Sequence, residues 1–380
     1  MAQLTHRGRV AQVLAHQEPD RVPLDLMGHA SLILDDMYFQ LRDYLGIQGD
    51  IAPFREGSTA NYYDERILKR FDIDFRRLML PTTPAAKMKY RPDGRFTDYW
   101  GITYAKEGPY VNVTDSPFRA ATSADDVDAL PWPEAKVVYH TAGLRDKARE
   151  MYENSDYALI ARNPLTAGFL DRGCQLRGMT EFLMDLLINP DLCHRMLDHL
   201  FRFFLEVFDL FLDAVGPYVT IVEFGDDLGA QSSLLISPAA YREFIKPRHK
   251  ALFAFIKSKA PHVKIFLHTD GAIFNLIPDL IEVGVDILNP VQTSAKGMEP
   301  ARLKETYGGK IVFHGAVESK ATEGTLEDIT NEVKRRIDQF GPGGDYILAP
   351  CNHIIQCPPA NVVAMYETAR AYGVYPLQGR

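Results

Sequence analysis

Short apolar runs alternate along the chain with longer segments whose apolar residues recur at helical spacing. A representative run is Val263–Leu267, which stops abruptly at the polar residues His268, Thr269 and Asp270 and at Gly271. A short β-branched and apolar run is typical of a buried strand, whereas apolar residues three and four positions apart predict an amphipathic helix. This stretch is therefore a predicted strand, a polar loop and then a helix.

The same unit recurs, and we count eight predicted strands, nearly all of them followed by a helix. They are Val22–Leu26, Ile73–Leu80, Tyr157–Ala161, Val219–Phe224, Val263–His268, Val285–Leu288, Lys310–Phe313 and Tyr346–Ala349. Eight such units in 380 residues favour a (β/α)8 TIM barrel over a doubly wound sheet, and no glycine-rich phosphate-binding motif follows any strand. We therefore expect an α/β fold with a single TIM-barrel domain over residues 1–380.

One stretch departs from the alternation of predicted strands and helices. Residues 89–117 alternate aromatic and polar side chains around Asp93-Gly94 and Glu107-Gly108, which are hairpin signals. We predict an inserted β-hairpin there, and the sequence leaves open whether it covers the site or forms a contact in a homodimer. Two later helices have clear start signals, at Ser237-Pro238 and at Thr325–Asp328.

Charge and composition exclude several classes of function. The net charge is −8 and lysines and arginines are scattered, so no patch suits nucleic acid or an anionic membrane. The N-terminus has no apolar segment of signal-peptide length, and no window approaches the roughly 20 apolar residues that span a bilayer. We expect a cytoplasmic protein whose four cysteines are free thiols. Arg248 and His249 lie on a basic helix and are expected to be solvated.

In a barrel, the residues just beyond the carboxyl end of each strand share one rim. In this chain they are rich in metal-ligand types: Glu223, Asp226, Asp227, His268, Asp270, Asn289, Gln292, His314, Glu318, Cys351, Asn352 and His353. Burying such groups unpaired would be costly, and a metal ion would compensate them together. Histidine, cysteine and carboxylate are the ligands that zinc prefers. Each residue alone has an ordinary alternative, because a loop aspartate often caps a helix and His314 could bond to a neighbouring loop.

Several motifs resemble the uroporphyrinogen decarboxylase superfamily. They are R-V-x-x-V-L-x-H-x-x-P-D-R-V-P at Arg9–Pro23, the segment Gly225–Gly229, the His-x-x-Gly tip at His268 with Gly284–Asp286 downstream, and Pro358-Pro359-x-Asn361. The resemblance spans most of the chain and is closest to the branch of corrinoid-dependent methyltransferases. It implies a (β/α)8 barrel, in agreement with the count of strands.

In that branch, zinc is held by a His-x-Cys strand tip and by a later cysteine near the last strand. His268 matches the histidine, Asp270 stands where the first cysteine would be, and Cys351 lies in the loop of the later one. The resemblance therefore implies zinc on His268, Cys351 and an acidic ligand, Asp270 or Glu223, or else a site that has lost the metal. A carboxylate in place of a thiolate gives a harder site, suited to polarising a methyl ether.

The leading hypothesis is a zinc-assisted methyltransferase that exchanges a methyl group between a small ether or thiol substrate and a corrinoid on a partner protein. The rim residues assigned to substrate orientation or proton transfer are Asp226, Asp227, His353 and Glu318, and those assigned to the cofactor are Asn289 and Gln292. One alternative is a metal-independent decarboxylase, in which Asp226 or Asp227 protonates a carbanion-like intermediate. Another is a non-catalytic binding subunit. The porphyrin site of the decarboxylases is expected to be absent, because Leu26–Leu32 lacks arginine.

Overall fold

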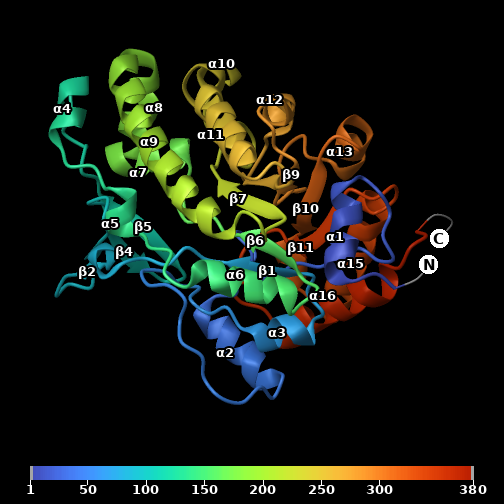
Figure 1. Cartoon of the computed structure of the whole chain (residues 1–380). Helices are drawn as coiled ribbons and strands as arrows, with labels where there is room; N and C mark the ends of the chain where they lie inside the picture. The colour runs from blue at the N-terminus through green and yellow to red at the C-terminus, as the bar shows by residue number, and fades with distance from the viewer. Residues whose placement is uncertain (1–2, 378–380) are drawn as a thin grey trace.

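Seven parallel strands curl into a barrel-like sheet with helices around it in the computed structural model, which describes residues 3–377 (Figure 1). Their order in the sheet follows the chain: β1 (Phe75–Leu78), β6 (Ala158–Ala161), β7 (Ile221–Gly225), β8 (Lys264–His268), β9 (Ile287–Asn289), β10 (Val312–Val317) and β11 (Tyr346–Pro350). Every pair of neighbours is parallel. The predicted TIM-barrel-like α/β fold is therefore confirmed.

The eighth position of the ring is taken by residues 22–26, which are predicted as a strand but form only isolated bridges. Leu24 makes one parallel bridge to Leu348 on β11, and its carbonyl accepts a hydrogen bond of 3.0 Å from the backbone of Asp74, next to β1. Pro23 has no N–H group, so it cannot donate to a continuous ladder. The segment nevertheless joins β11 to β1 and closes the barrel.

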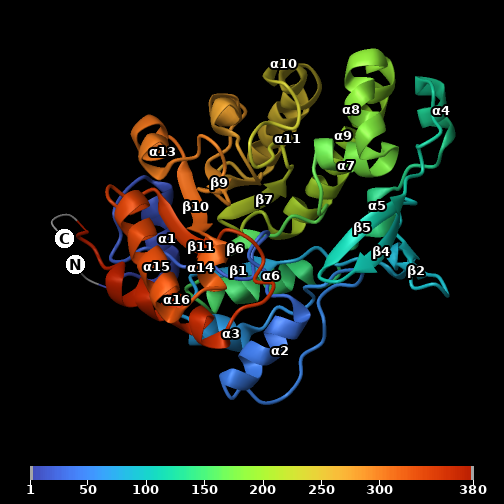
Figure 2. The same ribbon diagram turned by 180° about the vertical axis from the view of Figure 1, so that it is seen from behind.

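The helices surround this sheet, as the view from behind also shows (Figure 2). They are α1 (His6–Leu14), α2 (Asp35–Tyr44), α3 (Glu65–Arg70), α4 (Ala124–Ala129), α5 (Ala135–Val138), α6 (Leu144–Glu153), α7 (Phe169–Arg177), α8 (Met179–Ile188), α9 (Pro190–Val215), α10 (Pro238–Ala240), α11 (Lys246–Lys259), α12 (Ile277–Glu282), α13 (Pro300–Tyr307), α14 (Ser319–Thr322), α15 (Leu326–Phe340) and α16 (Pro359–Tyr372). Both predicted start signals are confirmed, because Ser237 caps α10 and Thr325 forms a capping box with Asp328 at α15. None of the helices within residues 3–377 is long and apolar enough to cross a membrane.

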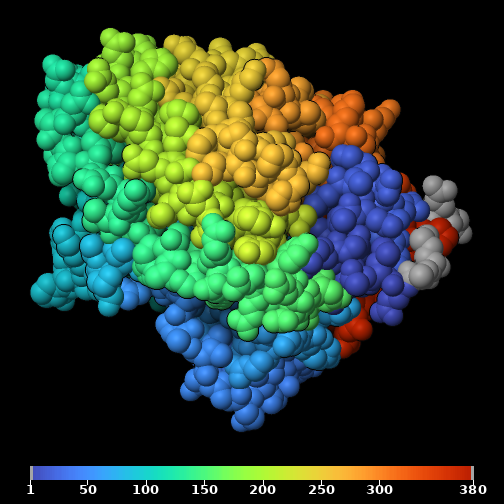
Figure 3. Space-filling model, in the orientation of Figure 1, coloured from blue at the N-terminus to red at the C-terminus, as the bar shows by residue number. Residues whose placement is uncertain are grey.

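Helix α1 closes the barrel at the amino ends of its strands. Val10, Val13 and Leu14 form one fully or almost fully buried cluster with strand residues. The strand residues in this cluster are Phe75, Ala158, Ile160, Ile221, Phe266, Ile287, Val312 and Ile347. In the space-filling view, the dark blue N-terminal segment lies between the orange and green parts of the chain (Figure 3). This end of the barrel is apolar and sealed, so the open end is the one at the carboxyl ends of the strands.

Asp74 fixes α1 to the barrel. Its carboxylate is fully buried and lies 2.8 Å from His6 Nδ1, 2.6 Å from Arg9 Nη1 and 2.8 Å from Arg21 Nη1. Burial raises the pKa of Asp74, but the hydrogen bond from His6 and the charges of Arg21 and Arg9 lower it by more, so the net shift is downward. The carboxylate therefore stays ionised and holds the N-terminal segment in place.

The inserted segment is a four-stranded antiparallel sheet rather than a single hairpin. Its strands are β2 (Lys89–Tyr90), β3 (Phe96–Thr97), β4 (Thr103–Glu107) and β5 (Tyr110–Asp115), in that order. The two predicted turns are present, since Gly94 and Gly108 both have positive φ between paired strands. The sheet stands beside the barrel, near α5 (Figure 1).

Candidate functional site

The loops after β7 and β8 bring Asp227, His268 and Asp270 together at the open end of the barrel. One nitrogen or oxygen atom from each side chain lies within 4.8 Å of those from the other two. His268 Nε2 is 3.5 Å from Asp227 Oδ1 and 4.0 Å from Asp270 Oδ2, which is too long for good hydrogen bonds. These three donor atoms therefore face a common space that a cation would fill.

Close backbone contact fixes the two loops relative to each other. Gly271 has a φ of +90°, and a Cβ atom there would lie 2.5 Å from the carbonyl carbon of Gly229, so a side chain could not be accommodated. The backbone N–H of Asp270 donates to Asp227 Oδ1 over 2.9 Å, and that of Leu228 donates to Thr269 Oγ1 over 3.0 Å. The carboxylates of Asp227 and Asp270 are thus held beside each other before any ligand binds.

Asn289 sets the orientation of the His268 ring. His268 Nδ1 lies 2.7 Å from Asn289 Oδ1, and Asn289 Nδ2 donates to His314 Nδ1 over 2.8 Å. Because the amide oxygen can only accept, Nδ1 of His268 carries a proton, and Nε2 is the ring nitrogen that faces the two carboxylates. A hydrogen bond of this kind to the second ring nitrogen is the usual support of a histidine metal ligand.

The polar contacts continue through the middle of the barrel. His314 Nε2 lies 2.9 Å from Asp25 Oδ2, Asp25 accepts two hydrogen bonds from Arg77, and Arg77 Nε donates to Glu223 Oε1 over 2.9 Å. The side chains of Asp25, Arg77 and Glu223 are fully buried. Burial raises the pKa of Asp25, but Arg77 and His314 lower it by more, so the carboxyl group is ionised. A continuous buried chain of polar groups therefore links Glu223 to His268.

Burial and neighbouring charges shift the pKa values of His268 and Asp270. Burial lowers the pKa of His268, and the carboxylates of Asp227 and Asp270 raise it by more, so that its net shift is upward. Burial and the charge of Asp227 raise the pKa of Asp270, although His268 opposes this. Asp270 Oδ1 is buried without a hydrogen-bond partner within residues 3–377. One carboxylate oxygen of Asp270 is therefore left without a partner among the described residues, which fits a site built for a cation.

Asp171 belongs to this site, although the sequence analysis did not select it. Its Oδ2 accepts a hydrogen bond of 2.9 Å from the backbone N–H of Asp227. Burial and the neighbouring carboxylates of Asp227 and Asp226 raise its pKa well above the usual range, so this carboxyl group carries a proton. An aspartate in the first turn of α7 looks in the sequence like an ordinary helix-start residue, so no signal pointed to it.

Asp226 caps helix α7, and its predicted catalytic role stays a prediction. Its two carboxylate oxygens accept hydrogen bonds of 2.9 to 3.2 Å from the backbone N–H groups of Phe169, Leu170 and Asp171, at the start of α7. His249 Nε2 lies 3.2 Å away, and both side chains are fully buried. The expectation that His249 is solvated is therefore wrong, because its ring is buried beside Asp226.

Two of the predicted metal ligands lie outside the group. Glu223 pairs with Arg77 inside the barrel and is not among the clustered donor atoms. Cys351 is fully buried and also outside the cluster. Burial raises the pKa of its thiol well above the usual range, and the carboxylates of Glu318 and Asp270 add to this. Among the described residues, the donor atoms that converge are therefore those of Asp227, His268 and Asp270, and the place of Glu223 and Cys351 in the ligand set stays a prediction.

The remaining predicted residues support neighbouring loops. Glu318 accepts hydrogen bonds from Thr293 and Ser294, and Gln292 accepts one of 3.1 Å from the backbone of Gly271. Asn289 contacts His268 and His314, and Gln292 Nε2 donates to Gln231 Oε1 over 3.0 Å. The role of these two amides in binding a cofactor stays a prediction.

His353 lies near the site in an unusual state. Its Nδ1 accepts a hydrogen bond of 3.1 Å from the backbone of Leu32. Burial lowers its pKa to about 3, and the charge of Arg55 contributes, so the ring is neutral. His29, which the sequence analysis did not select, places its ring centroid 4.7 Å from that of His268, and burial lowers its pKa too. These two neutral rings belong to the wall of the site and do not act as acids near neutral pH.

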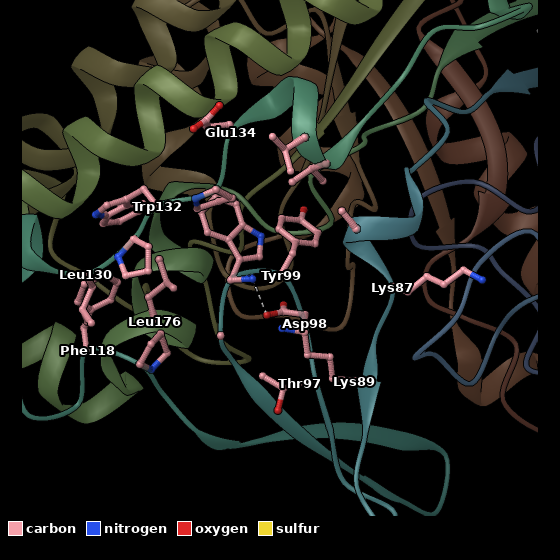
Figure 4. Close-up of a pocket in the computed structure, with 18 residues that line it drawn as sticks. Lys87, Lys89, Thr97, Asp98, Tyr99, Phe118, Leu130, Trp132, Glu134 and Leu176 are labelled. Atoms are coloured by element: carbon pink, nitrogen blue, oxygen red, sulfur yellow. Dashed lines mark hydrogen bonds between the residues drawn. The ribbon is translucent and has the colours of Figure 1, made fainter.

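The molecule also has cavities away from the metal-ligand group. One of about 390 Å³ lies beside the inserted sheet, where Trp132, Tyr99 and Asp98 surround it, and none of the predicted site residues line it (Figure 4). Another of about 330 Å³ is lined by Asp171 and Cys174. The second cavity therefore adjoins the candidate site through Asp171.

The chain is similar to known proteins over most of its length. The family model for uroporphyrinogen decarboxylase (URO-D) matches residues 104–372. A uroporphyrinogen decarboxylase from Alkalilimnicola ehrlichii is 23% identical over 367 residues, which cover 94% of this chain and 92% of that protein. A solved methyltransferase from Methanosarcina mazei has a TM-score of 0.67 at 17% identity, covering 97% of this chain and 99% of that one, and therefore shares the fold. Because the family model matches well over half of the chain, this protein belongs to the uroporphyrinogen decarboxylase family.

Proposed function

We propose that this protein is a cytoplasmic, zinc-assisted methyltransferase that moves a methyl group between a small methylated substrate and a corrinoid held by a partner protein. The observation that carries the proposal is the convergence of Asp227, His268 and Asp270, whose donor atoms lie within 4.8 Å of one another. Three protein ligands with one open position are the usual arrangement of a catalytic zinc site. The shared fold with a methyltransferase is in keeping with this activity.

The protein's own residues would prepare the site for this reaction. Asn289 holds the His268 ring so that Nε2 faces the ligand position, and Asp227 and Asp270 supply negative charge for a cation. A bound zinc ion would act as a Lewis acid on the heteroatom that carries the methyl group. Asp171 keeps a proton next to Asp227 and would protonate the demethylated product.

Metal analysis of protein purified without chelator tests the centre. We expect about one zinc ion per chain, as for other catalytic sites of this type, and loss of zinc in His268→Ala and Asp270→Asn. Cys351→Ser is the matched control, since Cys351 is buried nearby but outside the cluster, and it should retain zinc. Absence of zinc from the wild type would sink the metal mechanism, and loss of zinc in Cys351→Ser would refute this ligand set.

Methyl transfer itself needs a separate assay. Reduced cobalamin is mixed with the zinc-loaded protein and a panel of methyl ethers and thioethers, and the absorbance of Co(I) is followed. The proposal expects a loss of this absorbance with at least one donor, and none in His268→Ala. A zinc-loaded protein that leaves the signal unchanged with every donor contradicts methyl transfer, whatever the result of the metal analysis.

The second candidate is decarboxylation of a small carboxylate substrate, and Asp171 is the observation that favours it. A half-buried carboxyl group whose pKa is raised well above its usual range is suited to protonate the carbanion left by carbon dioxide. The sequence similarity to a decarboxylase is in keeping with this reaction. Release of carbon dioxide that survives His268→Ala and chelator but is lost in Asp171→Asn would favour it over methyl transfer.

A further inference from the structure

Two arginines from distant parts of the chain meet at the open end of the barrel. Arg162 directly follows β6, and Arg55 lies in the segment between α2 and α3. Both guanidinium groups lie on the ring of Phe54, with Cζ 4.7 Å from the centroid for Arg162 and 5.2 Å for Arg55. The structure therefore gathers two positive charges around one aromatic ring.

Neither arginine has an acidic partner. Within residues 3–377, no carboxylate lies within ion-pair distance of Arg55 or Arg162, whereas Arg77 in the same barrel has two. Arg55 uses Nε for the carbonyl oxygen of Ala60, at 2.9 Å. The Nε of Arg162 is buried and has no hydrogen-bond acceptor among the described residues. Two partly buried guanidinium groups are thus left with unused donors.

Such an arrangement is unfavourable unless an anion completes it. Burial lowers the pKa of Arg55 to about 9, and the charge of Arg162 contributes to this shift. Burial also lowers the pKa of Arg162 to about 10; the carboxylate of Glu223 opposes this shift, and the charge of Arg77 adds to it. Paired donors of two guanidinium groups match the planar, bidentate geometry of a carboxylate.

The two arginines lie close to the candidate metal centre. Arg162 follows β6, whose neighbour in the sheet is β7, and the last residue of β7, Gly225, lies against the ring of His29. The ring of His29 in turn lies 4.7 Å from that of His268, measured between centroids. An anion bound by the arginines would therefore lie at the same end of the barrel as the metal-ligand cluster.

We propose that Arg55 and Arg162 form a subsite for a carboxylate group of the substrate, which they hold next to the metal-ligand cluster. The role of this subsite in orienting a methyl donor rests on the proposed function, but its affinity for a carboxylate does not. The substrate class is accordingly a small carboxylic acid that also carries the reacting group. The expected absence of a porphyrin site concerned the stretch Leu26–Leu32, and neither Arg55 nor Arg162 lies in it.

Trifluoroacetate and trifluoroacetamide provide the test, because they have nearly the same shape and differ in charge. Their dissociation constants are measured by 19F NMR on the full chain, with and without added zinc. We expect the anion to bind at least ten times more tightly than the amide in both conditions. Arg55→Gln and Arg162→Gln should each weaken anion binding at least tenfold and leave amide binding unchanged. Arg55→Lys and Arg162→Lys, which keep the charge, should retain part of the preference.

Arg95→Gln is the matched control, since it removes an arginine from the exposed turn of the inserted sheet. It should bind both probes as the wild type does. Equal binding of anion and amide by the wild type, or full anion affinity in the folded Arg55→Gln and Arg162→Gln variants, would overturn the proposal. Anion binding that requires added zinc would also overturn it, because the metal would then be the binding group. Since the subsite is measured without turnover, its failure is distinct from failure of the methyl-transfer assay.

Discussion

Replacing Arg77 by methionine should destabilise this protein more than almost any other single change. Arg77 is fully buried between Asp25, at 2.6 Å, and Glu223, at 2.9 Å. Methionine keeps much of the side-chain volume but removes the charge, so two carboxylates are left without their partner. Breaking a buried ion pair in this way costs ~3–5 kcal/mol of unfolding free energy, because the remaining charge is uncompensated.

The loss of unfolding free energy in Arg77→Met should grow as the pH rises. In the wild type the pKa of Asp25 lies below that of the unfolded chain, so its ionisation stabilises the fold above about pH 4 and ceases to do so as the pH falls through the folded value. Without Arg77, burial raises the pKa of Asp25 above the unfolded value. The variant then loses stability as the pH rises from about 4, and the gap to the wild type widens toward pH 8.

Urea denaturation followed by circular dichroism at pH 5 and pH 8 measures both effects. Arg95→Met is the control, because Arg95 pairs with Asp93 on the exposed inserted sheet, and it should leave the unfolding free energy almost unchanged at either pH. Adding Glu223→Gln to Arg77→Met should recover part of the loss by removing one of the stranded carboxylates. A loss no larger than that of Arg95→Met, or one that does not grow with pH, would refute the reasoning.

Three further changes test other contacts. Asn289→Leu removes the acceptor that orients His268 and should weaken zinc binding ~10–100-fold in a chelator competition, with Asn289→Asp less affected. Asp226→Ala leaves backbone N–H groups of α7 without an acceptor and should lower the unfolding free energy in urea by ~2 kcal/mol or more, with a smaller loss in Asp226→Asn. Asp74 has a lowered pKa, so its ionisation stabilises the fold above about pH 4 and this contribution is lost as the pH falls through the folded value. The deficit of Asp74→Asn in urea should therefore be large at pH 7 and shrink toward pH 3.

Hydrophobic periodicity predicts the barrel because each strand is short, apolar and followed by an amphipathic helix. The failures have local causes. Residues 22–26 have the composition of a strand, but Pro23 has no N–H group to donate. The segment therefore forms isolated bridges to its neighbours and not a continuous ladder. The strands Lys89–Tyr90 and Phe96–Thr97 have two residues each, which is too short to show an alternation of polar and apolar side chains. The sequence therefore predicts a simple hairpin in place of the inserted sheet.

For the candidate site, the sequence predicts which polar side chains lie at the ends of neighbouring strands, and no more than that. His268 and Asp270 are recognised because neighbouring parallel strands place their polar tips on one rim, and the structure brings them together with Asp227. Which tips face each other depends on side-chain partners that the sequence does not reveal. Asp226 accepts hydrogen bonds at the start of α7, and Glu223 forms an ion pair with Arg77. Arg55 and Arg162 lie more than a hundred positions apart, and no spacing rule pairs them.

Compared with a histidine and two thiolates, the proposed ligands Asp227, His268 and Asp270 would keep the total charge of the site and change the chemical character of its donor atoms. Two carboxylates and a neutral imidazole carry a charge of about −2, which a divalent cation cancels, and a histidine with two thiolates would carry the same charge. Oxygen ligands are harder than sulfur, so a cation on Asp227, His268 and Asp270 retains more positive charge and favours an oxygen atom as the group to polarise. The guanidinium groups of Arg55 and Arg162 would hold the carboxylate end of the same molecule, next to the metal-ligand cluster. Together these features favour a methyl ether of a small carboxylic acid over a thioether or an amine.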